Sequence, residues 1–400
     1  MSPVIFLENK DGSSLLAFGE ETSIKMSVGN SLSLLNSFIK LNAKKYLFGF
    51  LGYDIKNEIE KLSSNNPDFI GFPDVFFFCP KHVVAINGDS TTYLQGEKNE
   101  KSESFVQLFL NKRNQTHQTS ISLTPRITKE EYLVKVNSLK THLQQGDIYE
   151  VTFCQEFFTE SAKIDPISTY HQLSKKTEAP FSCFVEVDGR YLLSGSPERF
   201  LKKEGKKLTS QPIKGTARRG KTTSEDEKAK ANLLASEKER SENVMIVDLV
   251  RNDLSRIAEK NSVKVEELFG VYSFPTVHQL ISTVSAVHRK SVDFDDIIRA
   301  LFPMGSMTGA PKISAMQLIE SHESFKRGLF SGSVGYIKPN GDFDFNVVIR
   351  SILYNENTSY LSCPVGGAIT IKSNPEEEYE ECLLKAEAMM QILDGGYDRK

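Results

Sequence analysis

The sequence has 400 residues, of which 39% are hydrophobic and 25% are charged, and it contains 25 glycines and 15 prolines. This composition excludes a disordered chain, a collagen-like repeat and a coiled coil, and it supplies enough apolar side chains for a large core. The 49 lysines and arginines nearly balance the 52 aspartates and glutamates, so the formal net charge is only -3. Neither nucleic acid nor a membrane surface is therefore expected as a partner, and any anion site must be local.

The cysteines and the N-terminal segment favour a cytoplasmic protein. The sequence has five cysteines, an odd number, and none of them is in a C-x-x-C motif. This pattern is typical of reduced thiols rather than of disulfides or zinc ligands. The opening segment, MSPVIFLENKDGSS, has an acidic residue at position 8 and too short an apolar run for a secretory signal. No stretch of the sequence reaches the roughly 18 to 20 apolar residues of a membrane-spanning helix.

The first 120 residues predict a strand-rich region. Short apolar runs bounded by Gly, Pro, Asp or Asn are typical of antiparallel strands, and this region contains SLLAF, KYLFGFLGY, PDVFFFCPKHVVAI and STTYL. Between Gly96 and Thr124 the sequence becomes polar and ends in QTHQTSISLTP, which predicts a linker. The chain is accordingly divided into an N-terminal part, residues 1–120, and a second region, residues 125–395.

A helix is predicted to begin at Thr128 and to end at Gly146. Thr128 and Glu131 have the spacing of a capping box, and glycine commonly ends a helix. Apolar residues recur between them at helical spacing: Tyr132, Val136, Leu139 and Leu143.

Further strands are predicted in DIYEVTFCQEFF, SCFVEV, RYLLSG, KLTSQPIKG, SGSVGYIK, FDFNVVIRSILY and SYLSCPVGGAITI. Two more long helices are predicted, one over residues 225–257 with a possible break and one over residues 375–393. Because strands outnumber helices and come in runs, the predicted fold class is α+β with antiparallel sheets.

Acidic residues on these two helices form the first candidate site. Glu378, Glu381 and Lys385 share one helix face, and Glu242 stands at the entry to an apolar run of the other helix. The simpler interpretation is a solvated face in one helix and an acidic first turn with an intrahelical ion pair in the other. The functional interpretation is that the three glutamates hold Mg²⁺, which prefers one or two carboxylates together with water and an anionic substrate.

Two loop segments are further candidates. In QPIKGTARRG, Lys214 stands between Ile213 and Gly215. A lysine in a loop is usually solvated, but one with these neighbours could be desolvated enough to act as a nucleophile or base.

The segment GSMTGAPKISAMQLIE, residues 305–320, does not fit the phosphate-loop pattern, so a nucleotide site is excluded. It predicts instead that Thr308 caps a helix beginning near Pro311.

Seven motifs in one order resemble those of the chorismate-using enzymes: SGSPERF, PIKGT, ENVMIVDLVRNDLSR, GSMTGAPKISAMQLIE, SGSVGYI, FDFNVVIRS and PEEEYEECLLKA. This family includes anthranilate synthase large subunits, aminodeoxychorismate synthase component I, and isochorismate and salicylate synthases. The resemblance covers about residues 125–392, with weaker similarity before them, and makes 125–395 the catalytic region. It implies a single large α+β unit whose antiparallel sheets surround a central, Mg²⁺-dependent chorismate site.

The resemblance also implies roles for individual residues. Glu242 and Glu381 match the metal carboxylates, Glu378 matches a nearby acid, and Glu198 matches the general acid that helps the C4 hydroxyl of chorismate leave. The residues that match the substrate-binding groups are Gly215 and Thr216 for the ring carboxylate, and Arg350, Gly366, Gly367 and Lys385 for the substrate carboxylates.

Two positions distinguish the branches of this family. Members that add water carry a lysine where this chain has Glu150, and anthranilate synthases carry an alanine where it has Lys214. The resemblance therefore implies the aminodeoxychorismate branch, in which Lys214 attacks C2 of chorismate, ammonia adds at C4, and the product leads to p-aminobenzoate and folate. Lys214 must be neutral to attack, and burial would favour that form. Ammonia would come from a glutamine amidotransferase subunit, because the sequence has no cysteine-centred glutaminase motif.

Two departures from the family pattern keep alternatives open. Gln279 stands where the family often has histidine, and Phe330 stands where many relatives have a tyrosine hydroxyl. The alternatives are an anthranilate synthase component I and a chorismate-binding protein that has lost catalysis.

Overall fold

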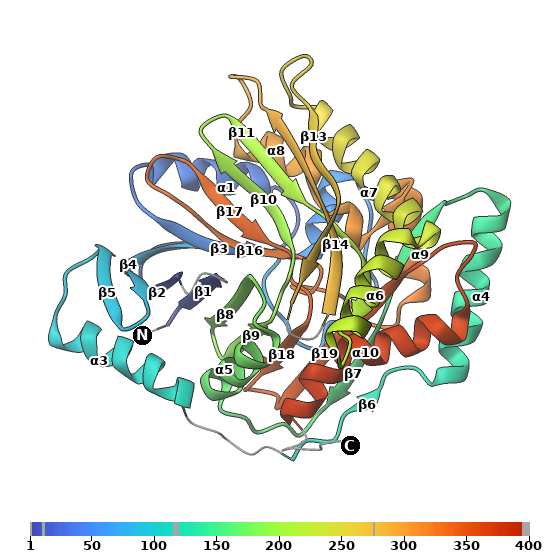
Figure 1. The fold of residues 1–400 in the computed structure, drawn as a ribbon. Helices are drawn as coiled ribbons and strands as arrows, with labels where there is room; N and C mark the ends of the chain where they lie inside the picture. Colours follow the sequence, from blue (N-terminus) through green and yellow to red (C-terminus); the bar gives the residue numbers. More distant parts are fainter. Residues whose placement is uncertain (1, 10–12, 115–119, 275–276, 394–400) are drawn as a thin grey trace.

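The computed structural model describes residues 2–9, 13–114, 120–274 and 277–393 (Figure 1). Within these ranges the strands are β1 (Val4–Asn9), β2 (Ser13–Met26), β3 (Leu47–Leu51), β4 (Val75–Asn87), β5 (Ser90–Gln95), β6 (Thr124–Pro125), β7 (Glu150–Thr159), β8 (Phe181–Val187), β9 (Arg190–Ser194), β10 (Arg199–Glu204), β11 (Lys207–Gln211), β12 (Ile213–Arg218), β13 (Lys264–Ser273), β14 (Val277–Val287), β15 (Gly309–Ala310), β16 (Ser333–Ile337), β17 (Phe343–Asn346), β18 (Ser351–Asn355) and β19 (Tyr360–Ile369). The α-helices are α1 (Ser31–Leu41), α2 (Lys56–Ile59), α3 (Glu100–Asn111), α4 (Lys129–Gln145), α5 (Pro166–Thr177), α6 (Thr223–Ala235), α7 (Glu237–Ser255), α8 (Phe294–Leu301), α9 (Lys312–His322) and α10 (Pro375–Leu393). Three short 3₁₀ helices complete the set: η1 (Tyr53–Ile55), η2 (Lys112–Asn114) and η3 (Gly305–Met307).

The strands pair antiparallel throughout, which confirms the predicted fold class. One continuous run of pairings is β13–β14–β11–β10–β17–β16–β3–β4–β2–β1–β8–β9–β18–β19–β7. Strand β12 adds to β14, β5 to β4, and β6 and β15 to β7. Because β1 pairs with β8 and β3 with β16, strands of the N-terminal part extend the sheet of the second region; the division at residues 1–120 and 125–395 stays a prediction.

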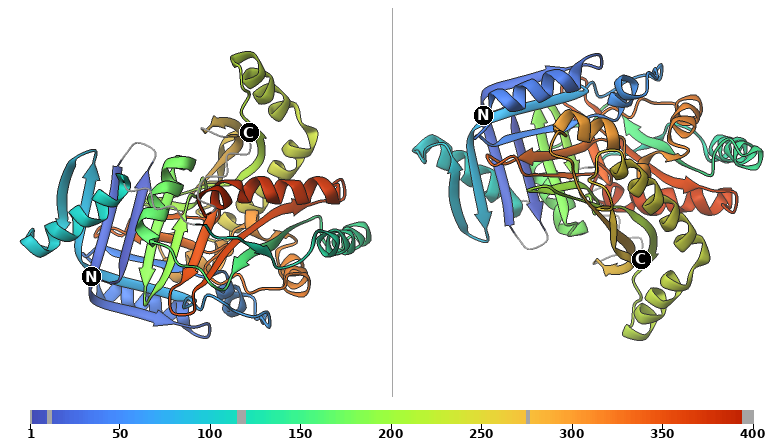
Figure 2. Two further views of the ribbon diagram at one scale, coloured as in Figure 1. Left: turned by 90° about the horizontal axis from the view of Figure 1, so that it is seen from below. Right: turned by 90° about the horizontal axis from the view of Figure 1, so that it is seen from above.

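Two apolar cores lie on opposite faces of this sheet. Side chains alternate along a strand, so on β1 Ile5 belongs to one core and Phe6 to the other. The first core joins strands from both ends of the run to α1, α7 and α8, and the second joins β1, β7 and β19 to α4, α9 and α10. The two views in Figure 2 show α6 and α7, in yellow-green, projecting from the side of the sheet. Among the helices that the structure describes, none combines the length and the hydropathy needed to cross a bilayer.

The three helices predicted in the second region are confirmed. Thr128 accepts a hydrogen bond from the backbone of Glu131, whose side chain accepts one from the backbone of Thr128, and Gly146 ends α4 with a positive φ of 85°. The helix predicted over 225–257 is broken at Ser236, whose extended backbone and side chain cap α7. The third helix, α10, spans the predicted residues.

Three details of the sequence-based prediction are wrong. The predicted linker contains α3, since a capping box at Asn99 starts a helix that buries Val106 and Phe109. Thr308 does not cap α9: its hydroxyl donates to the carbonyl of Met304 at 3.1 Å, inside the turn that precedes the helix. The single strand predicted in FDFNVVIRSILY is two strands, β17 and β18, separated by residues 347–350.

Candidate active site

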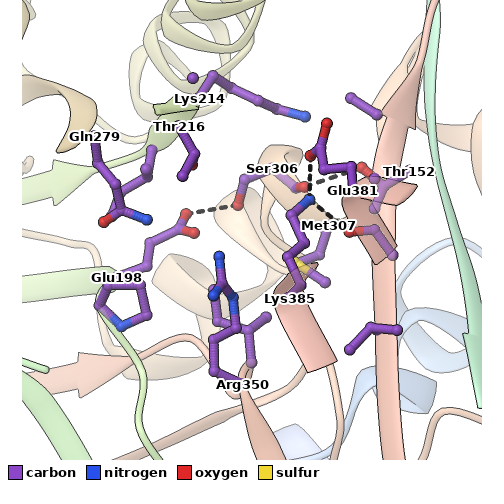
Figure 3. A pocket seen from close by; sticks show the side chains of 18 of the residues that line it. Thr152, Glu198, Lys214, Thr216, Gln279, Ser306, Met307, Arg350, Glu381 and Lys385 are labelled. Carbon is purple, nitrogen blue, oxygen red and sulfur yellow. Dashed lines mark hydrogen bonds and ion pairs between the residues drawn. The ribbon is translucent and has the colours of Figure 1, made fainter. Parts of the chain in front are cut away.

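A cavity with an empty volume of about 900 Å³ lies where β7, β12, β14, β19, α7, α10 and η3 meet. Figure 3 shows side chains from these separate elements pointing toward a common space. Ten of the predicted site residues line the cavity: Glu198, Lys214, Gly215, Thr216, Glu242, Arg350, Gly366, Gly367, Glu381 and Lys385.

The remaining predicted residue, Glu378, lies behind the cavity wall at Gly367. A Cβ atom placed on Gly367 would lie 3.3 Å from Oε2 of Glu378 and 3.7 Å from Oε1 of Glu381. The carboxyl groups of Glu378 and Glu381 therefore both lie close to the backbone at position 367. The structure thus brings Glu378 next to the other predicted residues although it does not line the cavity.

Lys214 is buried and ion-paired. Its exposed fraction is 8%, and its Nζ donates to Oε1 of Glu150 at 2.5 Å. Burial lowers the pKa of Lys214, but the carboxylates of Glu150 and Glu242 outweigh burial, so the net pKa is raised above its ordinary value. Lys214 is accordingly protonated in the ligand-free cavity.

Glu198 has the environment of a proton donor. It is 4% exposed, and its Oε1 accepts a hydrogen bond from the hydroxyl of Ser306 at 2.7 Å. Burial raises the pKa of Glu198 to about 7, although Ser306 and Lys214 partly oppose this effect. A carboxyl group with this pKa is substantially protonated near neutral pH and can give its proton to a leaving group.

The three predicted metal carboxylates differ in their partners. Glu381 forms an ion pair with Lys385 at 2.6 Å, which lowers the pKa of the Glu381 carboxyl to about 2, and Glu378 accepts a hydrogen bond from Lys238 at 2.9 Å. Burial raises the pKa of Glu242 to about 8. Among the residues that the structure describes, no three acidic, histidine or cysteine side chains converge as metal ligands do.

Two buried oxygens nevertheless fit a cation at this place. Oε1 of Glu242 and Oε2 of Glu378 are inaccessible to water and have no hydrogen-bond partner among the described residues. A buried carboxylate oxygen without a partner is costly, and a hard divalent cation is the ion that such oxygens bind. The donor set therefore suits Mg²⁺, provided that Glu378 and Glu381 exchange their lysine contacts for the ion.

Two cationic side chains, Lys385 and Arg350, also line the cavity. Lys385 donates to the carbonyl of Gly366 at 2.7 Å, which holds its Nζ at the cavity wall. Arg350 has a positive φ of 51° at the break between β17 and β18, and its guanidinium makes no hydrogen bond or ion pair with any described residue. A guanidinium with all its donors free can take a carboxylate in a two-point hydrogen bond.

Both residues that depart from the family pattern line the cavity. Gln279 pairs with Thr216 across β12 and β14, and Phe330 is buried at the cavity wall. His278, the neighbour of Gln279, does not replace the missing histidine. Its ring is fully buried outside the cavity, where Nε2 bonds Asp226 at 2.9 Å.

The sequence does not reveal several polar residues at or beside the cavity, among them Glu150, Thr152, Lys238, Glu239 and Ser306. Ser306 stands in a motif that predicts a helix start and supports the family resemblance, but neither gives Ser306 a role in the site. Glu150 was used to separate the family branches, but nothing in the sequence indicates that its carboxylate reaches Lys214, 64 positions along the chain.

Comparisons with known proteins agree with this geometry. The chain is 38% identical to "Aminodeoxychorismate synthase, chloroplastic" of Arabidopsis thaliana over 85% of its length and 39% of that protein, so it spans well under half of this plant relative. It is 30% identical to "Aminodeoxychorismate synthase component 1" of Bacillus subtilis (strain 168) over 98% of its length and 88% of that protein. The solved structure of anthranilate synthase component I from Streptococcus pneumoniae TIGR4 superposes with a TM-score of 0.81, at 26% identity, over 94% of this chain and 92% of that one.

A family model described as "chorismate binding enzyme" matches residues 2–391, nearly the whole chain. The match includes every residue that lines the cavity. The chain belongs to the family of chorismate-binding enzymes.

Proposed function

We propose that this chain is an aminodeoxychorismate synthase component I, which converts chorismate and ammonia to 4-amino-4-deoxychorismate. A glutamine amidotransferase subunit would supply the ammonia, as the words "component 1" in the Bacillus subtilis relative's name suggest. The observation that carries the proposal is the place of Lys214, whose side chain reaches the cavity that Glu198 and Glu242 also line (Figure 3).

In the proposed reaction, the neutral amine of Lys214 forms a bond to C2 of chorismate. The electrons of the conjugated ring double bonds move toward C4, the C4–O bond breaks, and Glu198 gives its proton so that water leaves. Ammonia then bonds to C4, the electrons return toward C2, and the bond to Lys214 breaks. The proton lost by the new C4 amine restores Glu198, so the sum is chorismate plus ammonia giving aminodeoxychorismate plus water.

The other lining residues would bind and orient the substrate. Arg350 and Lys385 would hold its carboxylates, and the backbone at Gly215 and Thr216 would lie against the ring carboxylate. Glu242, Glu378 and Glu381 would hold Mg²⁺, which supplies positive charge to a substrate carboxylate. With the substrate held between these groups, the ring would present C2 to Lys214 and C4 to Glu198.

The decisive test is incubation of the purified chain with chorismate, Mg²⁺ and an ammonium salt, followed by chromatography of the products. Aminodeoxychorismate without anthranilate is the expected result. Anthranilate as the main product would assign the chain to the anthranilate branch instead. Binding of chorismate with no product would indicate a protein that has lost catalysis, because Gln279 and Phe330 stand where relatives have histidine and tyrosine.

The metal assignment predicts a selective effect of two substitutions. Glu242→Gln and Glu381→Gln are each expected to raise the Mg²⁺ concentration for half-maximal activity by about tenfold or more, because each removes an anionic ligand. Titration of activity with Mg²⁺ measures the effect. Glu156→Gln is the control, since Glu156 is buried like Glu242 but does not line the cavity and pairs with Arg126. If the Glu242 and Glu381 variants keep the wild-type requirement, these residues do not bind the metal.

A further inference from the structure

Lys214 forms a buried ion pair with Glu150, and Glu150 has no role in the reaction described above. Glu150 is the first residue of β7, where pairing with Ala310 of β15 fixes its backbone. Its side chain is fully buried and is not among the residues that line the cavity. Its Oε1 accepts the hydrogen bond from Nζ, whereas its Oε2 is buried without a partner among the described residues.

The backbone of Lys214 is also held in place. Its carbonyl accepts a hydrogen bond from the side-chain amide of Asn243 at 3.4 Å, and the oxygen of that amide accepts one from Ser282 at 2.6 Å. Lys214 is therefore fixed at both ends, by Asn243 at its carbonyl and by Glu150 at its Nζ.

A protonated lysine has no lone pair and cannot attack carbon, so the proton on Nζ must go to an acceptor. The ionisable groups that face Lys214 from the elements around it are Glu150, Glu198, Glu239, Glu242, Glu381 and Lys385. Of these, Glu150 alone is within hydrogen-bond distance of Nζ among the described residues. It is the one group that can receive the proton without an intervening water.

We propose that Glu150 is a positioning residue for Lys214 that takes the proton of the lysine when the substrate fills the cavity. This inference rests on the proposed function, since it concerns activation of the same lysine. An ion pair loses the solvation of both of its charges in a dry site, whereas the neutral amine and the neutral carboxyl group lose much less. Displacement of water from the cavity by the substrate therefore favours transfer of the proton within the pair.

The transfer keeps protons and charges in balance. The ammonium of Lys214 and the carboxylate of Glu150 become an amine and a carboxylic acid, and the net charge of the pair does not change. The amine then gives its lone pair to C2 and becomes a secondary ammonium. When ammonia adds at C4 and the C2–N bond breaks, Lys214 leaves as a neutral amine and recovers its proton from Glu150.

The test is the pH dependence of adduct formation in single-turnover reactions without ammonium, stopped with acid and measured by mass spectrometry of the intact protein. Wild type is expected to need no deprotonation by solvent, so its rate does not fall as the pH is lowered from about 7 to about 6. Glu150→Gln keeps a hydrogen-bond acceptor but cannot take the proton. Its rate is expected to fall with decreasing pH and to be about tenfold or more below wild type near pH 6.

Two further variants separate proton transfer from packing. Glu150→Asp keeps the carboxylate and is expected to restore the wild-type pH profile, even where its absolute rate is lower. Glu156→Gln is the matched control, because Glu156 is a buried carboxylate of the same strand that pairs with Arg126 at 2.9 Å, and its variant is expected to keep the wild-type profile.

The outcomes are distinct. If Glu150→Gln forms the adduct near pH 6 as fast as wild type or faster, Glu150 only holds the lysine in its charged form, and the inference is overturned. If wild type itself forms no adduct and no aminodeoxychorismate, the proposed function fails, whatever the Glu150 variants do.

Discussion

Replacing Lys214 by alanine is expected to reduce formation of aminodeoxychorismate by about 10³-fold or more, since it removes the proposed nucleophile. The mass of wild-type protein stopped during turnover should increase by that of chorismate less water, and the variant should show no such increase. The Mg²⁺ requirement of any residual activity should stay near that of wild type, because Lys214 is not among the proposed ligands.

Lys312→Ala provides the matched control for this result. Lys312 is also a shielded, ion-paired lysine, which contacts Asp253 at 2.6 Å outside the cavity. Its loss should lower the thermal stability without removing the adduct. Undiminished turnover in Lys214→Ala would contradict a covalent role for this side chain and would leave direct addition of ammonia as the simpler mechanism.

The second large effect is expected at Glu198, whose pKa is raised to about 7 by burial. The protonated carboxyl is the active form, so the rate of adduct formation in wild type should be high below this pKa and fall as the pH rises through about 7. Glu198→Gln should lower the rate by about 10²- to 10⁴-fold, the usual contribution of a general acid, and should remove the descending limb of the pH profile.

Ser306→Ala tests the same assignment without removing the acid. The hydrogen bond from Ser306 lowers the pKa of Glu198, so its loss should move the descending limb toward higher pH while activity at low pH is largely kept. A limb that stays in place in the Ser306 variant, or that persists in Glu198→Gln, would show that another group causes the pH dependence.

Much of this site could be predicted from the sequence because its residues stand in ordered motifs. The motifs around Glu198, Lys214 and Arg350 predicted membership of the family, and the structure places all three side chains around one cavity. The partners of these residues could not be predicted. Ser306 reaches Glu198 and Glu150 reaches Lys214 only through the tertiary packing of separate strands, for which the local sequence pattern carries no signal.

The errors in the predicted elements have a similar cause. The polar composition of this segment does not predict α3, because a helix that packs on one face of a sheet needs only a narrow apolar stripe, here Val106 and Phe109. Threonine is a common N-cap residue, but the hydroxyl of Thr308 donates its hydrogen bond to Met304 within the preceding turn. In both cases the tertiary environment decided between two local structures that the sequence permitted.

The position of α10 at the far end of the described chain has a consequence for the timing of synthesis. This helix contributes Glu381 and Lys385 to a cavity whose first wall, β7, begins at residue 150. A ribosome must therefore synthesise the chain from residue 150 through residue 385 before Lys214 can meet these two groups. A product cut short before α10 would still contain strands β1–β19 but would lack Glu381 and Lys385, two of the charged groups that line the cavity.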